Sequence, residues 1–166
     1  MSFIFIDEIV SLEPGRRIRG LKRVLQEEPY FRDHFPGFPV VPGVLLTEMM
    51  AQTAGACLDA EGPGRGRSML GRIVNAGFKQ WVLPGQTVEI VADIAVSRPQ
   101  YATAKCRALV GANVAAVGEL FFTFAPAERF VRNWRDDLMD RFYAANPDAV
   151  RRAQYIPQDT GSEAAS

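Results

Sequence analysis

The chain is poor in side chains that bind metal ions, and neither sign of charge is in excess. Its 166 residues include one histidine, His34, and two cysteines, Cys57 and Cys106. These are fewer than the usual zinc ligand sets require, so we expect no metal site. The 19 basic side chains are balanced by 19 acidic ones, which argues against a protein that binds nucleic acid mainly through charge.

Long apolar runs are also missing. The longest ones are interrupted by Pro39, Pro42 and Glu119, and they fall short of the roughly 20 residues that cross a bilayer. The apolar start of the chain has no basic residue before it and is broken by Asp7 and Glu8, unlike a secretory signal. We therefore expect a cytoplasmic protein without a membrane span, in which both cysteines are reduced and buried.

What the chain does contain is typical of one globular domain. Hydrophobic residues make up 48% of the sequence and charged residues 23%, and the length suffices for a substantial core. From Gly43 to position 62 the sequence is rich in helix-forming apolar residues and predicts a buried helix. Strands are predicted at 17–25, 72–82, 87–97, 101–110 and 113–124, where apolar residues recur between turn signals. An α+β domain over residues 1–125, with an antiparallel sheet wrapped around one long helix, follows.

A second helix is predicted after this domain. Apolar side chains recur at helical spacing over 126–145, Pro126 suits the first turn, and Asn146-Pro147 suits the end. We expect a C-terminal amphipathic helix over 126–146, packed against its own domain or a second subunit. Residues 147–166 are expected to form a flexible tail.

One segment, HFPGFPVVPGVLLTEMMAQ from His34 to Gln52, combines groups that can carry chemistry. It places an imidazole on a proline-stiffened loop and, fourteen residues further on, the Glu48 carboxyl within an apolar helix. A carboxyl in such a setting must be paired, hydrogen-bonded or kept protonated. A protonated Glu48 beside His34 would form an acid and base pair. Taken alone, a histidine in this position is more typical of a structural or surface residue than of a catalytic one.

The same segment resembles the signature of the β-hydroxyacyl-acyl carrier protein dehydratases of fatty-acid synthesis, H-F-P-x-x-P-x-x-P-G-V-L-x-x-E-x-x-A-Q, and meets every fixed position of it. The resemblance extends from about Ile6 to about Phe124. It implies the hot-dog fold, in which an antiparallel sheet wraps a long helix. It also implies a hydro-lyase of lipid metabolism that uses no cofactor, acts on acyl carrier protein substrates, and forms a homodimer or a trimer of dimers.

Carried over to this chain, the resemblance implies a role for each motif residue. His34 would remove the C2 proton of the substrate, and Glu48, from the other subunit, would protonate the leaving hydroxyl. The backbone N–H of Gly43, at the expected start of the helix, would bind the thioester carbonyl, as free N–H groups at a helix N-terminus can. The substrate tunnel would be lined by three residues: Met49, Phe78 and Trp81.

Some positions depart from the family pattern. Asp33 replaces a common glycine and could weaken His34 as a base, while Gln86 replaces an acidic residue and Met49 a small one. A glutamate at position 48, where an aspartate could stand, resembles the branch that only dehydrates. Two alternatives stay open: a hot-dog acyl thioesterase and a non-catalytic subunit that binds acyl carrier protein.

Basic side chains cluster twice in this neutral chain. The first cluster comprises Arg16, Arg17, Arg19, Lys22 and Arg23, and the second comprises Arg65, Arg67 and Arg72. Either could be a solvated face, or a docking surface for the acidic carrier protein or for coenzyme A phosphates.

Overall fold

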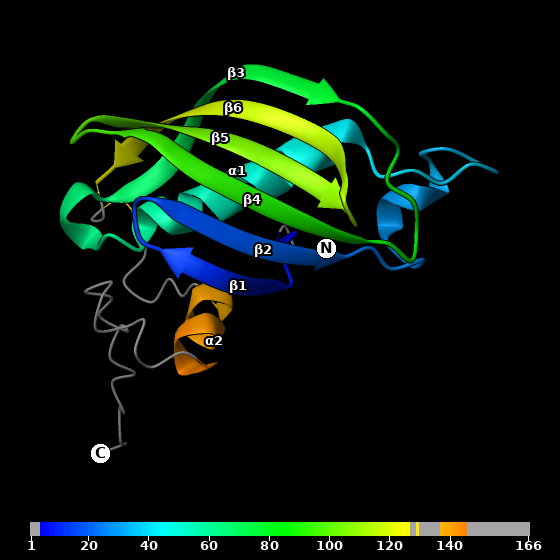
Figure 1. Cartoon of the computed structure of the whole chain (residues 1–166), viewed down its shortest axis with the longest axis horizontal. Coiled ribbons are helices and arrows are strands. Elements are labelled where there is room, and N and C mark those ends of the chain that lie inside the picture. Colours follow the sequence, from blue (N-terminus) through cyan, green and yellow to red (C-terminus); the bar gives the residue numbers. More distant parts are fainter. Residues whose placement is uncertain (1–3, 127–128, 130–136, 146–166) are drawn as a thin grey trace.

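A curved antiparallel sheet wraps around one long helix in the computed structural model, which describes residues 4–126, 129 and 137–145 (Figure 1). The elements are β1 (Glu8–Glu13), β2 (Arg17–Arg23), η1 (Pro29–Arg32), α1 (Gly43–Asp59), η2 (Pro63–Arg65), β3 (Arg67–Phe78), β4 (Thr87–Ser97), β5 (Tyr101–Val110), β6 (Asn113–Ala125) and α2 (Asp137–Ala145). This arrangement confirms the predicted α+β class and its hot-dog architecture.

The six strands follow the order β1-β2-β4-β5-β6-β3, and every neighbouring pair is antiparallel. β4 and β5 coincide with the predicted strands, and β6 extends one residue further. β3 occupies Arg67–Phe78 where 72–82 was predicted, because its register is set by pairing with β6 from Arg67 opposite Ala125 onward. β1 was not predicted, because an irregularity in its pairing between Ile9 and Ser11 interrupts the alternation of inward and outward side chains.

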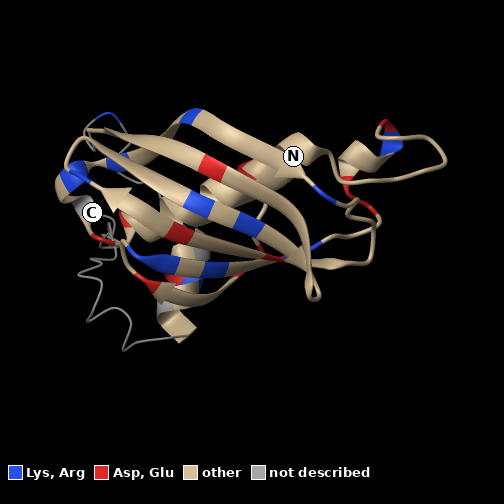
Figure 2. Cartoon of the chain, turned by 45° about the horizontal axis from the view of Figure 1, so that its top comes forward, with Lys and Arg blue, Asp and Glu red and all other residues tan. Residues whose placement is uncertain are grey.

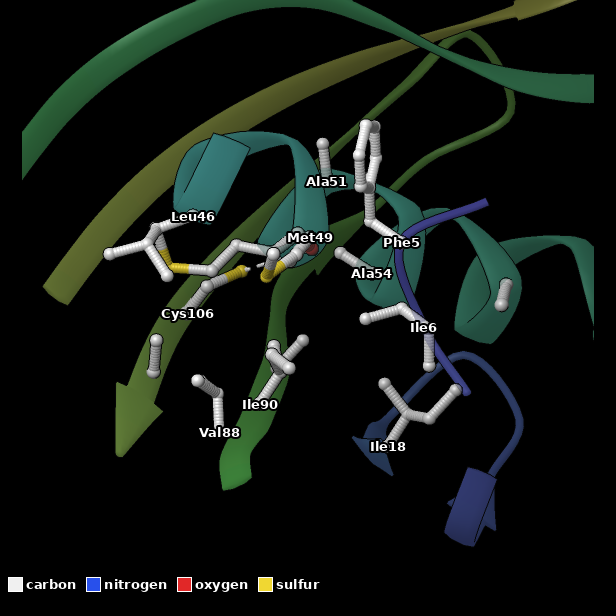
Figure 3. Close-up of a cluster of buried hydrophobic side chains, with 14 of the residues drawn as sticks. Phe5, Ile6, Ile18, Leu46, Met49, Ala51, Ala54, Val88, Ile90 and Cys106 are labelled. Atoms are coloured by element: carbon white, nitrogen blue, oxygen red, sulfur yellow. Dashed lines mark hydrogen bonds between the residues drawn. The ribbon is translucent and has the colours of Figure 1, made fainter. Parts of the chain in front are cut away.

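The core lies between α1 and the concave face of the sheet. α1 contacts β2, β3, β4, β5 and β6, and Figure 3 shows Leu46 and Met49 of the helix facing Ile90 and Cys106 of the sheet. One stripe of the helix is turned away from this core. It contains Val44, Glu48, Gln52, Gly55 and Asp59, none of which is buried. The prediction of a helix buried on nearly every side therefore holds except along this stripe.

The C-terminal extension contains α2, which contacts β1. It lies at the edge of the sheet opposite β3 (Figure 1). Met139 and Phe142 are buried on the hydrophobic core. The rest of the predicted helix (127–128, 130–136 and 146) and the predicted tail (147–166) lie outside the described residues. Among the described helices, none has the length and apolar character to cross a membrane.

Candidate active site

His34 lies on a loop that follows η1 and leads into α1. Prolines 36, 39 and 42 prevent a regular helix here, and backbone hydrogen bonds order the loop instead. The N–H of His34 donates to the Tyr30 carbonyl at 3.1 Å, and the N–H of Val40 donates to the His34 carbonyl at 3.0 Å. Phe35 and Phe38 exchange N–H to carbonyl bonds of 3.1 and 3.0 Å across a turn that contains Gly37 at φ +80°. This loop holds the backbone of His34 from both sides.

The imidazole of His34 is partly buried, and its Nδ1 lies 3.1 Å from the carbonyl oxygen of Val40. A carbonyl oxygen can only accept a hydrogen bond, so Nδ1 must carry the proton. In the neutral ring Nε2 then keeps its lone pair. The ring also stacks on Phe35, with centroids 4.2 Å apart. The site thus holds an imidazole in the tautomer of a base that acts through Nε2.

Glu48 lies on the outward stripe of α1, partly buried, and a glutamine one turn later orients it. Oε1 of Glu48 accepts a hydrogen bond of 3.0 Å from Nε2 of Gln52. The Gln52 amide is itself fixed, because its Oε1 accepts the backbone N–H of Phe5 at 2.9 Å. Gln52 closes the sequence motif, but the motif does not indicate this role for it. The spacing of four residues on a helix was the available signal for this contact.

Gly43 is the first residue of α1, and the structure shows why it is a glycine. A helix leaves its first N–H groups without intrahelical acceptors, and no other described residue accepts a bond from the Gly43 N–H. The ring of Phe78 lies against this residue, and a Cβ placed on Gly43 would come within 3.0 Å of it. A donor at the positive end of the helix dipole is therefore left available to an oxyanion.

The structure does not bring together the three residues expected along the tunnel. Met49 is fully buried, at 0% exposure, in the core between α1 and the sheet (Figure 3). Phe78 and Trp81 are 51% and 70% exposed on the single chain, and Trp81 meets Phe38 edge to face with centroids 5.0 Å apart. The two aromatic residues thus lie beside Gly43 and the His34 loop, and Met49 does not.

Carboxylates neutralise every member of the first basic cluster and two of the three in the second. Arg72, the third, has no ion pair among the described residues and lies over the Phe121 ring, 5.5 Å from its centroid. Figure 2 shows Lys and Arg alternating with Asp and Glu over the sheet. In the first cluster the ion pairs are Arg16–Glu13 at 3.4 Å, Arg17–Asp93 at 3.4 Å, Arg19–Glu89 at 2.6 Å, Lys22–Glu28 at 2.7 Å and Arg23–Glu8 at 2.9 Å. Every member of this cluster is therefore paired.

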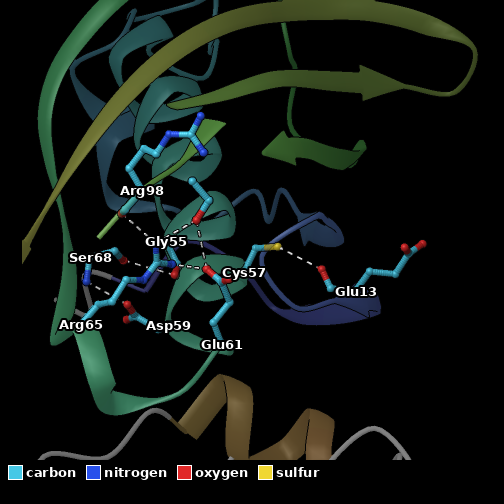
Figure 4. A network of polar contacts seen from close by, with 9 residues as sticks. Glu13, Gly55, Cys57, Asp59, Glu61, Arg65, Ser68 and Arg98 are labelled. Atoms are coloured by element: carbon cyan, nitrogen blue, oxygen red, sulfur yellow. Dashed lines mark hydrogen bonds and ion pairs between the residues drawn. The ribbon is translucent and has the colours of Figure 1, made fainter. Parts of the chain in front are cut away.

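The second cluster is used mainly to close the loop between α1 and β3 (Figure 4). Arg67 pairs with Asp59 at 3.0 Å, and Arg65 pairs with Glu61 while donating to the Arg98 carbonyl at 3.0 Å. Among the described residues, no group of three or more His, Cys, Asp or Glu side chains could hold a metal ion.

The model of FabA-like domains matches residues 1–119 of the chain. The chain belongs to the FabA-like family. α2 lies beyond the part of the chain that this family model matches.

Curated relatives of this FabA-like chain include the 3-hydroxyacyl-[acyl-carrier-protein] dehydratase FabZ of Geotalea uraniireducens. It is 42% identical over 126 residues, which are 74% of this chain and 87% of the relative. The enzyme of the same name from Ruminiclostridium cellulolyticum is 36% identical over 126 residues, 75% of this chain and 89% of the relative.

Solved structures resemble the chain at the level of fold. An uncharacterized protein from Pyrococcus horikoshii has a TM-score of 0.58 and 13% identity, with 75% of this chain and 87% of that one covered. The E. coli PaaI protein has a TM-score of 0.58 and 11% identity, with 71% and 78% covered.

Proposed function

We propose that this protein dehydrates β-hydroxyacyl-acyl carrier protein to trans-2-enoyl-acyl carrier protein in fatty-acid biosynthesis. Membership of the FabA-like family and the curated FabZ relatives support the reaction. The observation that carries the proposal is the bond between His34 Nδ1 and the Val40 carbonyl, because it leaves Nε2 able to accept a proton. This activity, with two buried and unpaired cysteines, fits a cytoplasmic protein.

The two motif side chains would perform the elimination together. Nε2 of His34 takes the proton from C2, and the electron pair of that bond forms the C2–C3 double bond. The bond from C3 to the hydroxyl oxygen breaks, and Glu48 in its acid form donates the proton with which the hydroxyl leaves as water. A proton then returns from His34 to Glu48, which restores the starting state.

Gly43 would stabilise the charge that develops during proton removal. As the C2 proton leaves, negative charge accumulates on the thioester oxygen. The backbone N–H at the start of α1 supplies a fixed donor for that oxygen, and the helix dipole has the favourable sign. The missing side chain leaves room for the Phe78 ring, which lies against Gly43 and would border the substrate beside this N–H.

A second copy of the chain would complete the site. Leu70, Ile73 and Phe78 of β3 pair with residues on the helix-facing side of β6, yet they are 38%, 49% and 51% exposed. β3 is also an edge strand, so its outer side can pair with another strand. We expect two copies to join along β3 and the outward stripe of α1, so that each Glu48 meets the partner's His34. A trimer of such dimers is the alternative assembly.

Docking of the acidic carrier protein would use cations near the site that have no carboxylate partner. Arg32 and Lys79 are exposed and have no ion pair among the residues described by the structure. Arg32 is two residues before His34, and Lys79 follows Phe78, whose ring covers Gly43. Positive charge beside the site would guide a negatively charged carrier to it.

Incubation with β-hydroxyacyl-acyl carrier protein, followed by mass spectrometry of the carrier, tests the proposal. We expect loss of one water with the acyl chain still attached. Release of free carrier thiol would indicate the thioesterase alternative, and tight binding without turnover would indicate a non-catalytic subunit.

A further inference from the structure

Lys22 is a buried lysine whose surroundings the proposed reaction does not use. The residue is 7% exposed and pairs in register with Val88 of β4, which is itself buried. A buried ammonium group is costly unless it is paired and hydrogen-bonded. Nζ of Lys22 lies 2.7 Å from Oε1 of Glu28 and 3.5 Å from Oδ1 of Asp7. Asp7 is held in place, since its Oδ2 accepts the Arg23 N–H at 2.6 Å.

Glu28, the nearer partner of Lys22, begins the short helix that leads to His34. It is the N-cap residue of η1, and its carbonyl accepts the N–H of Phe31 at 3.1 Å. The next residue but one, Tyr30, accepts the N–H of His34 at 3.1 Å through its carbonyl. A continuous series of contacts therefore runs from the Lys22 ammonium through Glu28 and η1 to the His34 backbone.

No other ion pair among the described residues joins residues 24–41, which carry His34, to the sheet. The other contacts of this segment carry no charge. They include backbone hydrogen bonds at its two ends, such as Val24 to Gln86 and Val41 to Val82, the contact of Phe38 with Trp81, and the buried side chains of Val24, Phe31, Val40 and Val41. Tyr30 adds no charge, because burial, and then the charges of Glu28 and Asp7, raise the pKa of its hydroxyl. The ion pair of Lys22 with Glu28 is therefore the charged contact that links the His34 loop to the sheet.

We infer that Lys22 is a positioning residue for His34: its buried ammonium fixes Glu28 and η1, and so the direction in which the imidazole Nε2 points. This inference rests on the proposed function for its effect on catalysis. The geometric part of it, the anchoring of the imidazole, does not depend on what the protein does.

The test compares Lys22→Met with Arg19→Met. Arg19 lies on the same strand and has an ion pair of similar length, 2.6 Å to Glu89, but it is not buried. Since His34 is the single histidine of the chain, ¹⁵N-histidine labelling gives one pair of ring nitrogen signals that reports its tautomer. We expect the ¹⁵N chemical shifts of Nδ1 and Nε2 to move toward each other in Lys22→Met. Without a fixed hydrogen bond to the Val40 carbonyl, the ring would populate both tautomers. Arg19→Met should give the wild-type spectrum.

Kinetics separate positioning from general stability. In Lys22→Met we expect kcat to fall about 10- to 100-fold while KM changes less than about twofold, as for a misplaced catalytic group. Glu28→Gln should also lower kcat. The double variant should have a kcat no lower than that of Lys22→Met alone, because both changes break the same ion pair. If Lys22→Met does not fold, the ring nitrogen shifts of His34 in Glu28→Gln test the inference instead.

Wild-type nitrogen shifts and wild-type kcat in the folded variants would overturn the inference while leaving the dehydratase proposal intact. A wild-type protein that does not dehydrate the substrate would overturn the proposed function, and the histidine spectra would still test the anchoring. An equal change of these spectra in Arg19→Met would also contradict a specific role for Lys22.

Discussion

Nδ1 of His34 lies 3.1 Å from the carbonyl oxygen of Val40, and the same two residues share a backbone bond of 3.0 Å in the opposite direction. The loop that places the imidazole therefore also sets its tautomer. A base for C2 needs an unprotonated nitrogen that faces the substrate, and this pairing leaves only Nε2 for that task. Glu48 and Gly43, brought by α1, supply the acid and the oxyanion donor of the proposed reaction.

Replacing Gln52 with Met should lower kcat about 10-fold, because the Glu48 carboxyl loses the donor that orients it. Steady-state kinetics on the carrier-bound substrate measure the effect. Gln100→Met, at an exposed turn between β4 and β5, is the control and should leave kcat unchanged. An unaltered kcat in Gln52→Met would show that this contact does not serve catalysis.

A mixed dimer should recover activity if the site is shared between two chains. We consider a heterodimer of a His34→Ala chain and a Glu48→Gln chain, carrying different affinity tags and purified through both. One of its two sites then keeps an intact His34 and an intact Glu48, so about half of the wild-type activity is expected. If both residues acted within one chain, the heterodimer would be as inactive as the two parent variants.

Tyr30→Phe should stabilise the protein. The Tyr30 hydroxyl is buried and has no hydrogen-bond partner among the described residues, so its removal relieves an unsatisfied group and raises the free energy of unfolding by about 1 kcal/mol. Urea denaturation measures the change. The control, Tyr101→Phe, removes the hydroxyl of an exposed tyrosine and should have no effect. A lower free energy of unfolding for Tyr30→Phe would mean that the hydroxyl does have a partner.

Stability should decline above pH 9 because of the two cysteines. Burial raises the pKa of each thiol from 9.0 to about 12. Below pH 9 both the folded and the unfolded chain keep these protons, while between 9 and about 12 only the unfolded chain releases them, so unfolding becomes more favourable as the pH rises.

Urea denaturation from pH 8 to 11 should therefore show a steeper loss for wild type than for a Cys57→Ala, Cys106→Ala double variant. Equal slopes for the two proteins would contradict the buried thiol assignment.

The sequence predicted the elements whose patterns are local. Apolar residues recur at alternate positions of the sequence over most of β4, β5 and β6, and α1 begins at Gly43, directly after a proline that a helix interior would exclude. The burial of Cys57 and Cys106 is confirmed as well. β1 and the true start of β3 escaped prediction because their registers depend on distant partners and on irregular pairing.

The residues of the candidate site also fall into two groups, those that the sequence identifies and those that only the folded chain reveals. The motif identified His34, Gly43 and Glu48 as candidates, since their spacing is a property of the sequence. The role of Gln52 depends on the backbone of Phe5, and Lys22 was counted among surface cations because only the folded sheet shows that it points inward. Contacts between segments far apart in the chain were therefore the part that sequence patterns could not supply.

The most direct measurement is the rate of enoyl formation from β-hydroxyacyl-acyl carrier protein by wild type, His34→Ala and Glu48→Gln, with thermal unfolding as the check that each variant is folded. Wild type should form the trans-2-enoyl product with release of water, and each variant should be slower by at least about 100-fold. A folded His34→Ala or Glu48→Gln variant that turns over at the wild-type rate would contradict the account.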